Sequence, residues 1–164
     1  MLPDFRGAAR KAGTLSALSV LVLDQLTKLL MSGLEPGRPV RVMGDLFRLS
    51  TRLNEGAAFS LSWGGPVVLT MVTAIAVAFL GFLILSGRIG DKASALALGA
   101  IAGGALGNLI DRLARGAVLD FIDIGAGAWR WPTFNVADIG ITIGGLALVL
   151  AHLRSGRGSR PENA

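Results

Sequence analysis

The chain has 164 residues, of which 52% are hydrophobic and only 16% are charged, and its mean hydropathy is +0.60. An average soluble domain carries about 25% charged residues, so the composition excludes a disordered chain and argues against an ordinary water-soluble protein. The length predicts a single domain. Cysteine is absent, which excludes disulfides, a thiol nucleophile and cysteine metal ligands. The net charge of +5 comes from short segments between apolar runs, as is usual near membranes, so no nucleic-acid partner is expected.

Four apolar runs predict four transmembrane helices, at residues 12–31, 66–86, 93–110 and 134–153. Arg6 and Arg10 precede the first run, as in a secretory signal peptide. However, Asp24 and Lys28 lie inside it and no Ala-x-Ala cleavage pattern follows, so we predict an uncleaved span. Four spans place both termini on the same side of the membrane. Apart from Lys28, eight Lys or Arg residues lie on the side of the termini and seven on the other, which is too even for the positive-inside rule.

The connection over residues 32–65 has its own pattern. Phe47, Leu49, Thr51 and Leu53 alternate with polar residues, and this period of two predicts a β-strand. We therefore expect a small extramembrane β-cradle there, followed by a turn at Gly56-Ala57-Ala58-Phe59.

The connection over residues 120–131 is short and amphipathic, and it predicts a short interfacial helix lying on the membrane surface. The three Trp residues lie at span ends on this same side, which is typical of an interfacial aromatic belt; they are Trp63, Trp129 and Trp131.

The up-down-up-down order of the spans brings the unusual polar residues together at one side of the membrane. These are Asp24, Lys28, Asn54, Asn108, Asp111, Arg112, Asp120, Asn135 and Asp138. Ionisable groups in membrane spans are costly and are therefore functional candidates. Asp24 and Lys28 are four residues apart and either neutralise each other or contact substrate. Asp111 continues the small-residue line Gly99, Gly103 and Gly107, so we expect a buried structural group paired with the adjacent Arg112.

Asp120 and Asp138 have no cation three or four residues away. Two carboxylates brought together share a proton, so one can activate water while the other protonates a carbonyl oxygen, as in aspartic proteases. Ion or proton transport also uses intramembrane aspartates, and the spacing alone leaves both interpretations open. Asp123 adds a further negative charge beside Asp120 or points to solvent.

Other catalytic schemes find no support in the sequence. A His-Glu-x-x-His metalloprotease motif and the Gly-x-Gly-Asp pattern of presenilin-type proteases are absent. The only histidine, His152, lies at the far end of the fourth span, which excludes a Ser–His triad near the polar residues. A Ser–Lys dyad would need Lys28 as a base, and Asp24 keeps that lysine protonated.

The sequence resembles the bacterial lipoprotein signal peptidases, also called signal peptidase II, over residues 12–153. Five motifs in order carry the resemblance: Asp24-Gln25-Leu26-Thr27-Lys28, Asn54-Glu55-Gly56-Ala57-Ala58-Phe59, Gly103-Gly104-Ala105-Leu106-Gly107-Asn108-Leu109-Ile110-Asp111-Arg112, Val118-Leu119-Asp120-Phe121 and Phe134-Asn135-Val136-Ala137-Asp138. Leu119 stands where the family usually has valine.

The resemblance implies an all-α polytopic aspartic endopeptidase of the bacterial inner membrane, with four spans, a β-cradle and both termini in the cytoplasm. Its substrates would be diacylglyceryl-modified prolipoproteins, cut before the lipidated cysteine. It implies catalysis by Asp120 and Asp138, no metal or cofactor, contact with membrane lipid, and a monomer. The expected substrate-binding or supporting residues are Asp24, Lys28, Asn54, Gly56, Gly104, Asn108, Asp111, Arg112, Asn135 and Ala137. Of these, Gly56 and Gly104 would let the substrate backbone approach closely. A small polytopic transporter subunit is the alternative.

Overall fold

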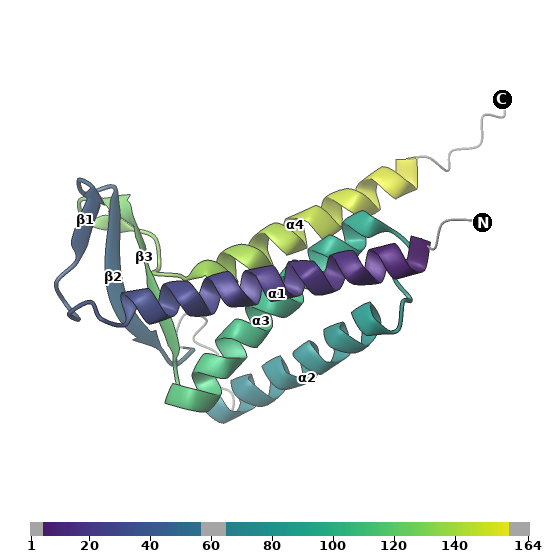
Figure 1. Cartoon of the computed structure of the whole chain (residues 1–164). Helices are drawn as coiled ribbons and strands as arrows, with labels where there is room; N and C mark the ends of the chain where they lie inside the picture. The colour runs from purple at the N-terminus through teal and green to yellow at the C-terminus, as the bar shows by residue number, and fades with distance from the viewer. Residues whose placement is uncertain (1–4, 57–64, 158–164) are drawn as a thin grey trace.

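Four long helices and a small antiparallel sheet make up the fold, as predicted (Figure 1). The computed structural model describes residues 5–56 and 65–157. The helices are α1 (Phe5–Met31), α2 (Gly65–Leu85), α3 (Lys92–Arg115) and α4 (Val136–Arg157). Each is long and apolar enough to cross a membrane. The sheet lies at one end of the helices, and the chain termini lie at the opposite end (Figure 1).

Helices α1, α3 and α4 extend beyond the apolar runs that predicted them, and α4 continues to Arg157. Helix α1 begins at Phe5, before its apolar run, because a helix can continue with polar residues outside the hydrocarbon region. Helix α3 begins where the Asp91 carboxylate accepts a hydrogen bond of 2.7 Å from the Ser94 N–H. It continues past residue 110 and ends at Gly116, whose φ of 75° places it in the left-handed region.

Helix α3 is the centre of the helical layer, and its small residues are the reason. Half of the most apolar stretch of α3 is buried, whereas only 6% of the corresponding stretch of α2, which faces outward, is buried. A Cβ at Gly103 would meet the backbone of Ala17 in α1, and a Cβ at Gly104 would meet the carbonyl oxygen of Ala137 in α4. Glycine at these two positions therefore lets α1 and α4 approach α3 closely. Gly103 lies on the predicted small-residue line, and its contact with α1 confirms that line as a packing face.

The sheet has the order β1-β2-β3-β4, formed by Val40–Met43, Phe47–Asn54, Val118–Ala126 and Trp129–Arg130. Strand β2 confirms the strand predicted from the alternation. Its end pairs with the start of β3, so that Arg52 lies opposite Asp120 and Asn54 opposite Val118. This pairing brings a loop that follows α1 next to the segment that follows α3.

The predicted interfacial helix at residues 120–131 is wrong. Residues 118–126 form β3, a strand paired on both sides, with β2 and with the short β4. Val118, Ile122 and Ile124 are β-branched and favour a strand. The decisive cause is that β2 forms backbone hydrogen bonds with β3. The sequence of residues 120–131 alone does not indicate this partner strand.

Two other expectations concern the surface near the sheet. Asp123 does not point to solvent, since its carboxylate pairs with both Arg48 and Arg130. Trp129 is 88% exposed and Trp131 is also exposed, in agreement with an aromatic belt. Trp63 and residues 57–59 of the predicted turn lie outside the described residues.

Candidate active site

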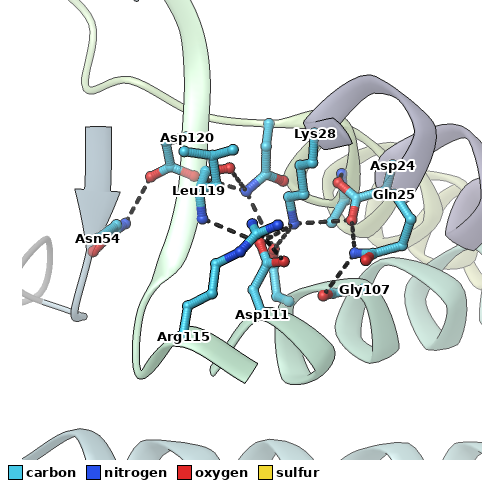
Figure 2. A network of polar contacts seen from close by, with 12 residues as sticks. Asp24, Gln25, Lys28, Asn54, Gly107, Asp111, Arg115, Leu119 and Asp120 are labelled. Carbon is cyan, nitrogen blue, oxygen red and sulfur yellow. Dashed lines mark hydrogen bonds and ion pairs between the residues drawn. The ribbon is translucent and has the colours of Figure 1, made fainter. Parts of the chain in front are cut away.

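The predicted polar residues gather where α1, α3 and α4 meet the sheet (Figure 2). Six of them are buried, namely Asp24, Lys28, Asn108, Asp111, Asp120 and Asn135. Asn54 and Asp138 are half-buried. The cluster is therefore shielded on the side of the helices and reaches solvent at Asn54 and Asp138.

Asp138 is held by the start of α4. Asn135 precedes the helix, and its side-chain oxygen accepts a hydrogen bond of 3.0 Å from the Asp138 N–H. In return, Asp138 Oδ2 accepts one of 3.2 Å from the Asn135 N–H. This reciprocal arrangement is a capping box, in which two residues three apart each satisfy a free N–H of the first helical turn. The spacing of Asn135 and Asp138 thus fixes the carboxylate at the helix start.

Asp120 is held by two side-chain amides. Its Oδ1 accepts a hydrogen bond of 2.7 Å from Asn135 Nδ2, and its Oδ2 accepts one of 2.9 Å from Asn54 Nδ2. The Asn54 amide is itself oriented, because its oxygen accepts a hydrogen bond of 2.9 Å from the Gly56 N–H. Gly56 has a φ of 100°, which favours glycine. Figure 2 shows Asn54 and Asp120 pointing toward each other from neighbouring strands.

Burial raises the pKa of Asp120 to about 6, because the charged form loses solvation. The amide hydrogen bonds from Asn54 and Asn135 oppose this rise, and the nearby charge of Asp138 adds to it. Asp120 can therefore carry a proton at a pH at which an ordinary aspartate is fully ionised.

Asn135 and Asn108 connect the two aspartates. Asn135 caps Asp138 through its oxygen and donates to Asp120 through its nitrogen. Asn108 donates a hydrogen bond of 2.9 Å to Asp138 Oδ1. The carboxyl groups of Asp120 on β3 and Asp138 on α4 are thus held within one amide framework, which is an arrangement suited to sharing a proton.

Lys28 lies beneath this framework and is 1% exposed. Its Nζ lies 2.9 Å from Asp24 Oδ2 and 2.8 Å from Asp111 Oδ2, and it donates a hydrogen bond of 3.0 Å to Asn108 Oδ1. The predicted neutralisation of Asp24 by Lys28 is confirmed. The second oxygen of Asp24 accepts a hydrogen bond of 2.9 Å from the Ala137 N–H, so α1 also fixes the start of α4.

The predicted pairing of Asp111 with Arg112 is wrong. Asp111 pairs with Lys28 and, at 3.4 Å, with Arg115. Neighbouring helix residues point in directions about 100° apart, whereas residues four apart share a face. Asp111 Oδ2 also accepts a hydrogen bond of 3.1 Å from the Leu119 N–H, which holds the first residues of β3 against α3.

Arg112 is half-buried and interacts electrostatically with Asp138, Asp120 and Asp111. Within residues 5–56 and 65–157 its side chain makes no hydrogen bond and no close ion pair. Its guanidinium therefore supplies positive charge beside the two aspartates.

The expectation that Gly104 admits the substrate backbone is wrong, because the backbone of α4 occupies that space. Gly104 and the fully buried Ala137 instead form one of the close contacts between α3 and α4. Sequence reasoning assigned no role to Gln25, whose Nε2 donates to Asp24 Oδ2 and to the Gly107 carbonyl. It also missed Arg115, although the spacing of four from Asp111 could have indicated the pair.

Comparisons with known proteins agree with these observations. The sequence profile of the family described as Signal peptidase (SPase) II matches residues 16–154. The lipoprotein signal peptidase of Paraburkholderia phytofirmans is 42% identical over 151 residues, which cover 88% of this chain and 86% of that protein. That of Rhodococcus jostii is 44% identical over 141 residues, covering 82% and 68%. A bacterial membrane enzyme solved at 2.3 Å resolution superposes with a TM-score of 0.80 at 27% identity, covering 93% of both chains.

Proposed function

The chain belongs to the signal peptidase II family and is an aspartic endopeptidase that removes signal peptides from prolipoproteins, and we propose that Asp120 and Asp138 are its catalytic pair. The observation that carries the proposal is the amide framework of Asn54, Asn108 and Asn135, which donates hydrogen bonds to both carboxyl groups. Asp138 and Asn54, the amide partner of Asp120, are half-buried and form the edge of the cluster where a peptide can reach the pair.

In the proposed mechanism Asp120 carries the shared proton and Asp138 acts as the base, because burial raises the pKa of Asp120 to about 6. Asp138 takes a proton from water, and the hydroxide attacks the peptide carbonyl carbon. Asp120 gives its proton to the carbonyl oxygen at the same time. The carbon–nitrogen bond then breaks: the proton on Asp138 goes to the leaving nitrogen, and a hydroxyl proton of the intermediate returns to Asp120. Each cycle consumes one water and restores both aspartates.

The scissile bond proposed for this chain is the one before a diacylglyceryl-modified cysteine. Three features support a lipid-anchored substrate: the helices are long enough to span a membrane, the catalytic pair lies at one end of them, and two exposed Trp residues lie near that end. We further propose that the sheet end faces outward and both termini face the cytoplasm. Within the described residues, both carboxyl groups and the amides that bond to them come from one chain, which supports a monomer.

The transporter alternative receives no support. A transport path needs polar groups along the depth of the membrane. Among the described residues, the buried charged side chains all lie at the sheet end; they are Asp24, Lys28, Asp111, Asp120 and Asp123.

The test uses the purified full chain in detergent with a diacylglyceryl-modified prolipoprotein, and cleavage is followed as a shorter band. The unmodified precursor is the matched control. We expect cleavage of the lipidated form, little cleavage of the unmodified form, and none of either by Asp120→Asn or Asp138→Asn. Equal rates on both substrates would refute the lipid requirement. Cleavage by folded Asp120→Asn would refute the catalytic pair.

A further inference from the structure

We propose that Lys28 is a positioning residue for the reaction, because its ammonium group fixes which end of the Asn108 amide faces Asp138. This inference rests on the proposed catalytic pair. Within residues 5–56 and 65–157, Lys28 makes no hydrogen bond or ion pair with either catalytic aspartate, so it would act through Asn108.

The chemistry of Lys28 determines the orientation of Asn108. An ammonium group has three N–H donors and no acceptor. Here the three donors have three oxygen partners, on Asp24, Asp111 and Asn108. The atom of Asn108 that faces Lys28 must therefore be the oxygen. Asn135 Nδ2 lies 3.2 Å from the same oxygen and adds a second donor.

This orientation has a direct consequence for Asp138. With its oxygen held by Lys28, Asn108 presents its NH₂ group to Asp138 Oδ1 at 2.9 Å. If the amide turned over, its oxygen would face the carboxylate, and two acceptors would be opposed unless Asp138 took the shared proton. Lys28 thus keeps the proton on Asp120 and leaves Asp138 free to accept one from water.

Charge and orientation are separate contributions of Lys28. Burial raises the pKa of Asp120, and the positive charge of Lys28 lowers it. The charged groups around Lys28 and the pair are Asp24 on α1, Arg52 on β2 (opposite Asp120), Asp111, Arg112 and Arg115 on α3, Asp120 on β3 and Asp138 on α4. Lys28 is the buried cation among them, whereas the Arg115 side chain is 41% exposed.

A purely structural role for Lys28 makes a different prediction. In that case Lys28 only neutralises Asp24 and Asp111 and holds α1 against α3. Its loss would lower the unfolding temperature and leave kcat per folded molecule and its pH profile unchanged. The two roles are therefore separated by kinetics on folded protein.

The experiment compares Lys28→Met, the double variant Asp24→Asn/Lys28→Met, and Arg115→Met in detergent. Removing both members of a buried ion pair leaves no unpaired charge between them, so the double variant guards against a folding defect. Arg115→Met is the matched control, because it removes a cation from Asp111 without touching Asn108. The readouts are kcat and KM for the lipidated prolipoprotein at several pH values and the unfolding temperature.

We expect kcat per folded molecule to fall about tenfold or more in both Lys28 variants, because they lose an interaction that stabilises the transition state. KM should change less than about twofold. The pH at which activity is lost on the alkaline side should rise in Lys28→Met, by about one unit, and change little in the charge-neutral double variant. Arg115→Met should keep kcat and the pH profile.

One further comparison tests whether Lys28 acts through Asn108. Asn108→Leu removes the amide, so adding Lys28→Met to it should not lower kcat further. A folded double variant Asp24→Asn/Lys28→Met with wild-type kcat would overturn the inference while leaving the catalytic pair intact. Activity in folded Asp120→Asn would instead overturn the proposed function itself.

Discussion

Replacing Asn54 by leucine should raise the pH at which cleavage is lost on the alkaline side. Asn54 donates one of the two amide hydrogen bonds that Asp120 receives, at 2.9 Å. This bond stabilises the ionised form of Asp120, so its removal raises the pKa of Asp120 above about 6. Because Asp120 holds the proton that the reaction needs, activity is present below this pKa and is lost as the pH rises through it.

The size of the effect follows from the strength of the bond. A hydrogen bond to a charged group contributes about 1.5–3 kcal/mol. Asn54 is only half-buried, so the lower figure applies. One pKa unit corresponds to about 1.4 kcal/mol, so the alkaline limb should move up by about one pH unit.

The assay is kcat for the lipidated prolipoprotein from pH 5 to 9, per molecule of folded protein. Thr51→Val is the matched control, since Thr51 lies on the same strand and its hydroxyl bonds only to the Leu34 carbonyl among the described residues. An alkaline limb that stays in place or moves down in Asn54→Leu, while Thr51→Val is unchanged, would refute the assignment of the proton to Asp120.

Four further predictions concern stability and topology. The pKa of Asp120 rises from 3.8 to about 6 on folding, so Asp120 stabilises the folded state most at low pH. As the pH rises from 3.8 to about 6, the free energy of unfolding should fall by up to about 3 kcal/mol. The pH dependence of the free energy of unfolding should be correspondingly smaller in Asp120→Asn. Asp111→Asn should lower stability by about 3 kcal/mol, because Lys28 loses a charged partner, while folded protein still cleaves; an inert but stable variant would make Asp111 a catalytic residue. Gly103→Val should destabilise by about 3 kcal/mol or more in thermal unfolding, because its side chain meets the α1 backbone, and an unchanged midpoint would contradict that packing. A cysteine introduced at Gly90 should resist an impermeant thiol reagent in intact cells, and labelling there would reverse the proposed orientation.

The features that the sequence determined are those encoded by neighbouring residues. Hydropathy gave the four helices, because a span must be continuously apolar. Alternation predicted β2, and the spacing of Asp24 and Lys28 predicted their ion pair. The order of the spans was enough to predict that the polar residues meet at one end, since each helix reverses the direction of the chain.

The features that only the tertiary structure decided depend on partners far apart in the chain. Residues 118–126 are a strand because β2 pairs with them, and Asp111 bonds Lys28 because α1 packs on α3 at glycine positions. The link from Lys28 through Asn108 to Asp138 joins three helices. Local periodicity indicates which face of a helix or strand is apolar. It does not indicate which residue of another element will lie opposite that face, and it is this pairing between elements that determines the hydrogen bonds and ion pairs.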